Sequence, residues 1–214
     1  SAVVITNNAP LVFPFGVTNI TWTATDIYGN TAVCIQTVTV EDVENPIITC
    51  PADLTLTNDP GQCTNSFVLP IISATDNCTI ATVTNDAPAS FPLGTTLVTW
   101  TATDVQGNSS NCTQFVTVID TELPSIVCPA NITVPALFGS CEAVGVVLGT
   151  PTTSDNCSVA SVTNNALVNY PLGTTIVTWT VTDAAGNTST CTQTVTVTDT
   201  QLPTIACPTN VSVP

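Results

Sequence analysis

Residues 98–108 read VTWTATDVQGN, and residues 177–187 read VTWTVTDAAGN. A third version, ITWTATDIYGN, occupies residues 20–30. In each stretch hydrophobic residues alternate with threonine, so one face is apolar and the other polar, as in a β-strand that covers a core. The closing Asp-x-x-Gly-Asn is typical of a hairpin turn, because glycine readily adopts positive φ. These stretches predict long antiparallel strands.

The three stretches belong to an internal repeat. The tryptophans are spaced by 78 and 79 residues, at Trp22, Trp100 and Trp179. A period of this length suits an autonomous domain better than a solenoid turn of about 20 to 45 residues. Short acidic linkers leading into proline mark the boundaries. We therefore expect the C-terminal half of a repeat at 1–42, complete repeats at 43–120 and 121–199, and the first strand of a further repeat at 200–214.

Every cue within a repeat indicates β-structure, and no segment has a helical period. In the repeat 43–120 we expect seven short strands, at 46–50, 53–57, 66–71, 79–84, 88–91, 95–103 and 112–119. So many strands in so short a repeat, with one tryptophan on the apolar face, predict a small sandwich. The expected fold is all-β, a tandem series of immunoglobulin-like antiparallel β-sandwiches that are disulfide-stapled.

The charge composition excludes several classes of function. The chain has 15 acidic residues and no Lys, Arg or His, for a net charge of −15. Binding to a phosphate backbone needs basic side chains, and Ser-His-Asp or Cys-His catalysis needs a general base that is absent. Anionic membrane surfaces would repel the chain, and no apolar run is long enough to span a bilayer. We expect no nucleic-acid binding, no membrane insertion, no enzyme activity and no catalytic residue.

Repeated aspartates are the candidate metal ligands. They stand in the hairpin turns and before the linkers, at Asp42, Asp104, Asp120, Asp183 and Asp199. Ca²⁺ prefers oxygen ligands of this kind, so a calcium site that stiffens a linker is one interpretation. The alternative is that hairpin aspartates cap turns and linker acids keep sheet edges soluble. The sequence suggests no other cofactor.

Ten cysteines recur at fixed spacing, four in each complete repeat. This is typical of a disulfide framework in an oxidising, extracellular compartment, whereas zinc ribbons need closely spaced pairs. The strand map puts Cys50 and Cys112 on strands that are commonly neighbours, and leaves Cys63 and Cys78 on either side of one strand. Pairing Cys50 with Cys63 and Cys78 with Cys112 remains the alternative.

Several motifs together resemble the HYR module, or hyalin repeat. They are I-x-C-P at 48–51 and 126–129, Asp-Asn-Cys at 76–78 and 155–157, and FPLGTTLVTWTATDVQGN at 91–108. The resemblance covers both complete repeats. It implies an immunoglobulin-like extracellular module of adhesive or matrix-like proteins and of very large bacterial surface proteins.

The resemblance also bears on the disulfide bonds, because some hyalin repeats carry only the first and last of these cysteines. It therefore favours the pairs Cys50–Cys112, Cys63–Cys78, Cys128–Cys191 and Cys141–Cys157. Cys34 and Cys207 then need partners outside these repeats. Either the chain continues at both ends, or the strand at 203–207 completes the half-repeat of a neighbouring subunit.

The sequence therefore predicts an extracellular, cell-surface structural or adhesive repeat that forms a stalk or filament. Its expected partners are neighbouring copies of the same repeat or protein, and a glycan or cell-surface protein. Alternatives are a ligand- or carbohydrate-binding module and a spacer appended to a secreted enzyme. N-glycosylation sequons are expected to be usable at Asn19, Asn108, Asn111, Asn131, Asn187 and Asn210.

Overall fold

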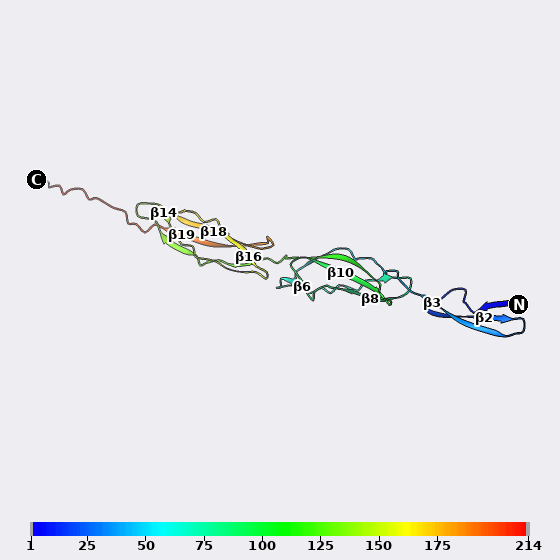
Figure 1. Ribbon diagram of the computed structural model, residues 1–214. Coiled ribbons are helices and arrows are strands. Elements are labelled where there is room, and N and C mark those ends of the chain that lie inside the picture. The colour runs from blue at the N-terminus through cyan, green and yellow to red at the C-terminus, as the bar shows by residue number, and fades with distance from the viewer. Residues whose placement is uncertain (1, 213–214) are drawn as a thin grey trace. The chain divides into compact units, whose positions relative to one another are not determined.

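The computed structural model describes residues 2–212, and these residues form β-strands, turns and loops (Figure 1). By its contacts the chain divides into two compact units. Unit 1 comprises Ser1–Leu54, Val68–Pro88 and Leu97–Phe115, and unit 2 comprises Thr55–Phe67, Ala89–Thr96 and Val116–Pro214. Within residues 2–212 no helix is long and apolar enough to cross a membrane. The predicted all-β, immunoglobulin-like fold class is confirmed.

The first sheet comes from the predicted half-repeat. Strands β1 (Val3–Asn7), β2 (Gly16–Asp26) and β3 (Thr31–Val40) are antiparallel in the order β1-β2-β3. Trp22 stands opposite Cys34 in the β2–β3 hairpin. Val38 and Val40 are only half-buried here, whereas the equivalent valines of the complete repeats are buried. This sheet therefore lacks a covering layer within the described residues.

The predicted repeat at 43–120 contains eight strands: β4 (Ile47–Ile48), β5 (Leu54–Thr57), β6 (Thr64–Asn65), β7 (Ala74–Thr75), β8 (Ile80–Asn85), β9 (Phe91–Pro92), β10 (Gly94–Asp104) and β11 (Ser109–Ile119). The main sheet has the order β5-β11-β10-β8, and β4–β7 and β6–β9 form short pairs. From Val98 to Asp104 the residues of β10 alternate between buried and half-buried, as the sequence predicts. Gly107 closes the β10–β11 turn at a φ of 94°.

The predicted repeat at 121–199 has the same plan. Its strands are β12 (Ser125–Val127), β13 (Ile132–Pro135), β14 (Glu142–Val144), β15 (Thr152–Ser154), β16 (Val159–Asn164), β17 (Asn169–Pro171), β18 (Gly173–Asp183) and β19 (Thr188–Thr198). The main sheet has the order β13-β19-β18-β16, with β13 parallel to β19. The β12–β15 and β14–β17 pairs are antiparallel.

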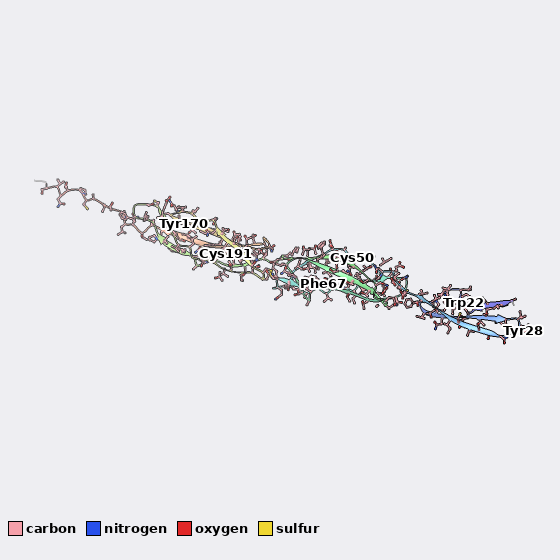
Figure 2. All side chains as sticks on the ribbon, viewed as in Figure 1. Trp22, Tyr28, Cys50, Phe67, Tyr170 and Cys191 are labelled. Carbon is pink, nitrogen blue, oxygen red and sulfur yellow. A yellow bond between two sulfur atoms is a disulfide. The ribbon has the colours of Figure 1, made fainter. Side chains whose placement is uncertain are left out.

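The core of this second sandwich is built on the alternating faces of β18 and β19. Its buried members are Ala143, Tyr170, Val177, Trp179, Val195 and Val197. Tyr170, labelled in Figure 2, is on β17 and Cys191 is on β19, with the cysteine packed against this core. The threonines between the inward residues point outward, so the alternation fixes which face is buried.

In each complete repeat a buried glutamine accepts a hydrogen bond from the indole N–H of the core tryptophan. The indole N–H of Trp179 donates to Oε1 of Gln193 over 3.1 Å, and Trp100 donates to Gln114 over 3.2 Å. The amide of Gln193 donates to the carbonyl oxygens of Ala130 and Leu148. These bonds compensate for the polar groups that the sandwich buries.

Two strand predictions were wrong. No strand forms at 66–71; the short strands β6 and β7 lie on either side of that segment instead. Residues 200–212 form no strand, although β4 lies at the equivalent repeat position. β4 is held by pairing with β7. The backbone of residues 200–212 has no such ladder partner within the described residues.

Candidate functional site

The hairpin aspartates Asp104 and Asp183 end strands β10 and β18 and are each only 2% exposed. Oδ1 of Asp104 accepts hydrogen bonds from the backbone N–H groups of Gln106 (2.8 Å) and Asn108 (2.9 Å). Its Oδ2 accepts from Nδ2 of Asn108 over 2.8 Å. In the second repeat, Asp183 accepts two equivalent bonds from Asn187. The backbone N–H of Asn187 donates to Oδ1 and its Nδ2 donates to Oδ2, each over 2.8 Å. Both carboxylates act as turn caps.

These hydrogen bonds also change the pKa of the two carboxyl groups. Burial opposes ionisation of Asp104 and Asp183, but the hydrogen bonds outweigh it and lower the pKa of both carboxyls below 3.8. The largest of these contributions comes from the asparagine side chain, Asn108 or Asn187. Both aspartates therefore remain charged at neutral pH inside their turns.

The same asparagines hold the linkers beside the turns. Nδ2 of Asn108 donates to the carbonyl oxygen of Asp42 over 3.1 Å, and Nδ2 of Asn187 donates to that of Asp120 over 3.2 Å. The turn sequence Asp-x-x-Gly-Asn therefore does more than close a hairpin. Its asparagine fixes the linker aspartate at the end of the sheet.

Each of these two linker aspartates meets an aspartate from an Asp-Asn-Cys motif. Asp42 lies with Asp76 and Cys78, and Asp120 lies with Asp155 and Cys157, and in each group the candidate ligand atoms are within 4.8 Å of one another. We call Asp42 with Asp76 and Asp120 with Asp155 the linker aspartate pairs. The first pair belongs to unit 1 and the second to unit 2.

The structure therefore places the predicted calcium ligands in different surroundings. Asp42 and Asp120 join the linker aspartate pairs, whereas Asp104 and Asp183 are occupied as turn caps. Asp199 is exposed, accepts a hydrogen bond from the backbone N–H of Gln201, and joins no such group in the described part of the chain. Sequence reasoning missed Asp76 and Asp155. The signal available was the recurrence of Asp-Asn-Cys in each repeat.

The thiol of Cys78 lies in the first of these groups. Its hydrogen bond with the Asp42 side chain, burial, and the negative charges of Asp42 and Asp76 raise its pKa. The thiol therefore stays protonated at neutral pH. It is a poor nucleophile and a poor metal ligand in that state, since the thiolate is the reactive form.

The structure contains two of the predicted disulfide bonds. Cys50 is bonded to Cys112 and Cys128 to Cys191, each with Cα atoms 5.7 Å apart. The third bond joins Cys63 to Cys157, whose Cα atoms are 5.0 Å apart. Among the described residues the cysteines without a disulfide partner are Cys34, Cys78, Cys141 and Cys207.

The predictions Cys63–Cys78 and Cys141–Cys157 are thus wrong for this structure. They rested on the resemblance to the hyalin repeat and on a strand at 66–71 with Cys63 and Cys78 on either side of it, and that strand does not form. Cys63 instead belongs to unit 2 together with Cys157, and Cys78 belongs to unit 1.

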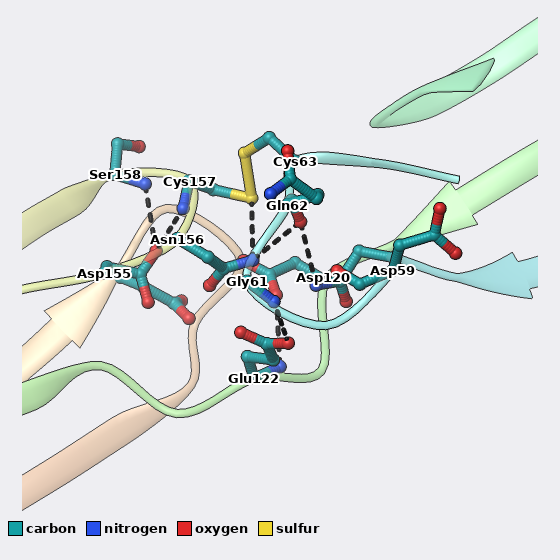
Figure 3. The surroundings of a disulfide bond; sticks show 12 residues. Asp59, Gly61, Gln62, Cys63, Asp120, Glu122, Asp155, Asn156, Cys157 and Ser158 are labelled. Atoms are coloured by element: carbon teal, nitrogen blue, oxygen red, sulfur yellow. Dashed lines mark hydrogen bonds between the residues drawn. A yellow bond between two sulfur atoms is a disulfide. The ribbon is translucent and has the colours of Figure 1, made fainter. Parts of the chain in front are cut away.

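Hydrogen bonds surround the Cys63–Cys157 bond (Figure 3). Nδ2 of Asn156 donates to the carbonyl oxygen of Gln62 over 2.9 Å. The backbone N–H of Gly61 donates to Oε1 of Glu122 over 2.7 Å. The loop before β6 is therefore bonded on one side to the Asp-Asn-Cys motif and on the other to the acidic linker.

The structure also separates the predicted glycosylation positions. Asn108 and Asn187 use their Nδ2 groups in the hydrogen bonds described above, and Nδ2 is the atom to which a glycan is attached. A glycan replaces one of the two hydrogens of Nδ2, so at either position it would remove at least one of the two bonds that this group donates. The remaining candidates are exposed: Asn19, Asn111, Asn131 and Asn210.

The chain is similar in sequence to two hyalins. The chain is 33% identical over 215 residues to hyalin of Lytechinus variegatus and 34% identical over 215 residues to hyalin of Strongylocentrotus purpuratus, covering 94% of this chain in both cases. It covers 40% and 18% of the lengths of those two proteins. A solved structure of protocadherin gamma C5 EC1–3 is similar at 13% identity with a TM-score of 0.40, covering 85% of this chain and 76% of that one.

A further relative is the Sushi, von Willebrand factor type A, EGF and pentraxin domain-containing protein 1 of Rattus norvegicus. It is 31% identical over 179 residues, which cover 76% of this chain and 5% of that protein. The family model of the HYR domain matches residues 41–118 and 119–197. The chain therefore belongs to the HYR domain family.

Proposed function

We propose that this chain is part of an extracellular array of HYR repeats that works mechanically, as a stalk or filament. The observation that carries the proposal is the Cys63–Cys157 bond. It joins a cysteine in the first HYR match, 41–118, to a cysteine in the second, 119–197. A covalent bond between successive repeats resists their separation under load in a way that a flexible linker does not.

The unpaired cysteines extend this pattern. Cys78 stands at the repeat position of Cys157, and Cys141 stands at that of Cys63. We infer that each bonds to a cysteine of an adjoining repeat, so that one inter-repeat disulfide recurs at every joint. Cys34 and Cys207 are equivalent to the cysteines that pair within a repeat, and we infer partners of that kind for them.

The surface favours a structural role over carbohydrate binding. Trp100 and Trp179 are buried in the sandwiches, 1% and 6% exposed, and their indole groups are hydrogen-bonded to glutamines. They are therefore unavailable as platforms for stacking sugars. The partners we propose are neighbouring copies of the repeat, and through them an adhesive contact at the cell surface. We propose no catalytic role.

Electron microscopy of the native material tests this proposal. If the chain is part of a mechanical array, the images should show extended filaments of regularly spaced modules. In force–extension measurements, each repeat should extend further after the disulfide bonds are reduced than before. Single compact particles attached to a catalytic domain would instead support the appended spacer. An extension that reduction leaves unchanged would contradict the inter-repeat bonds.

A further inference from the structure

The two linker aspartate pairs each contain carboxylate oxygens that the protein leaves unsatisfied. Asp120 is 7% exposed. Its Oδ2 and Oδ1 of Asp155 are buried and have no hydrogen-bond partner within residues 2–212. The same holds, across that part of the chain, for Oδ2 of Asp42 and Oδ1 of Asp76. Buried acceptors in native proteins almost always have a partner, so four such oxygens at two equivalent places indicate an absent ligand.

The free oxygens are held in position by the bonds of their neighbours. Oδ1 of Asp120 accepts from the backbone N–H of Glu122 over 3.1 Å. Oδ2 of Asp155 accepts from the backbone N–H groups of Cys157 and Ser158, each over 2.9 Å. Each carboxylate is thus fixed by one oxygen and presents the other. The site is ordered before any ligand arrives.

A third oxygen belongs to the same motif. Nδ2 of Asn156 donates to the carbonyl oxygen of Gln62, while Oδ1 of Asn156 is buried and lacks a partner among the described residues. The unsatisfied atoms in this region are all acceptors, and none is a donor. A ligand that meets them must therefore supply positive charge or protons.

The protein cannot supply that charge from its own side chains, since its sequence contains no Lys, Arg or His. Two carboxylates with oxygens within 4.8 Å repel each other, and burial makes an uncompensated charge costly. We propose that each linker aspartate pair binds a divalent cation with oxygen ligands, Ca²⁺ at an extracellular surface.

The ligand set fits a hard cation. Sulfur-binding metals need thiolates, and the sulfur nearest the second pair, that of Cys157, is already in a disulfide bond. Only one free oxygen comes from each aspartate, so water must complete the six to eight ligands that Ca²⁺ takes. We expect dissociation constants of about 10⁻⁴–10⁻³ M, the range of extracellular calcium modules. This proposal does not depend on the mechanical role.

Calorimetric titration of the whole chain with Ca²⁺, after treatment with EDTA, tests the proposal. Ionic strength is held at about 0.15 M so that general screening of the −15 charge does not change. We expect two ions per chain for the wild type and one for the double variant Asp120→Asn, Asp155→Asn. A parallel titration with Mg²⁺ identifies which ion the site prefers, because Mg²⁺ requires a stricter octahedron.

Asp199→Asn is the matched control. Asp199 has the same repeat position as Asp42 and Asp120, but joins no aspartate pair in the described residues. This variant removes the same charge and is expected to keep two ions. The proposal would be overturned if the double variant still bound two ions, or if Asp199→Asn also lost one ion. It would also be overturned if the wild type showed no saturable binding at millimolar Ca²⁺.

Thermal unfolding distinguishes the loss of a cation site from simple misfolding of the double variant. In EDTA the double variant is expected to melt above the wild type, because it has lost the repulsion between the two carboxylates. In Ca²⁺ the order is expected to reverse. A purely structural role for Asp120 predicts a lower melting temperature for the variant under both conditions, and that result would contradict the cation site.

Discussion

Cys63 and Cys157 are joined by a disulfide bond although 94 residues separate them in the sequence. That separation exceeds the repeat period of 78 or 79 residues. The bond therefore connects consecutive repeats, whereas Cys50–Cys112 and Cys128–Cys191 each close a loop within one repeat. Two kinds of disulfide bond, with different consequences for stability, follow from this arrangement.

The bond within a repeat is expected to carry more of that repeat's stability. Replacing Cys128 and Cys191 by serine opens a loop of 63 residues, which costs about 4 kcal/mol on the chain-entropy model. Replacing Cys63 and Cys157 leaves that loop closed. Because this bond spans two repeats, its removal is expected to weaken the coupling between them more than the stability of the second repeat itself. Urea unfolding followed by tryptophan fluorescence measures both. Equal losses would mean that the two kinds of bond are not distinct.

Trp179 is expected to be a principal contributor to the second core. Trp179→Ala removes a large buried side chain and leaves a cavity and an unpartnered Oε1 on Gln193, so the free energy of unfolding should fall by about 3–5 kcal/mol. Trp22→Ala is the control, because Trp22 is only half-buried in the first sheet. Its effect should be clearly smaller in chemical denaturation.

The hairpin asparagine is expected to matter for both turn and linker. Asn187→Ala removes hydrogen bonds to the Asp183 carboxylate and to the carbonyl oxygen of Asp120, and should cost about 1–3 kcal/mol. Asn30→Ala is the matched change in an exposed turn, where Asn30 bonds to the Asp26 side chain. If both substitutions had the same effect, the bond to the linker would contribute nothing.

The capped aspartates predict a loss of stability in acid. The folded pKa of Asp183 lies below its ordinary value of 3.8, so the unfolded chain binds this proton more readily than the folded one. The stabilisation is complete above about pH 3.8 and is lost as pH falls through the folded pKa. Urea unfolding between pH 6 and about pH 2 measures this slope. Asn187→Ala should flatten it, and an unchanged slope would refute the capping role.

Much of the fold could be predicted because the alternation around Trp100 and Trp179 has a period of two. That pattern fixes which residues face inward, and both tryptophans are buried as it predicts. The Cys128–Cys191 bond, which the resemblance to the hyalin repeat favoured, also forms. The short strands β6 and β7 were harder, since two residues contain no period. Their positions depend on the pairing partners β9 and β4, which local sequence does not encode.

The candidate site was only half predictable for a related reason. Asp42 and Asp120 were found because they precede the linkers, but their partners lie 34 or 35 residues further along the chain. Only folding brings Asp76 and Asp155 to them. The bond between Cys63 and Cys157 was missed because the four cysteines were assigned to one repeat at a time.

Cleavage after glutamate tests the central claim of a covalent joint between repeats most directly. The chain has no site for trypsin, but Glu122 lies between Cys63 and Cys157 in the sequence. After free thiols are blocked and the protein is denatured, we predict that the fragments on either side of Glu122 remain joined and separate only on reduction. Fragments that separate without reductant would show that Cys63 is not bonded to Cys157, and would contradict the account.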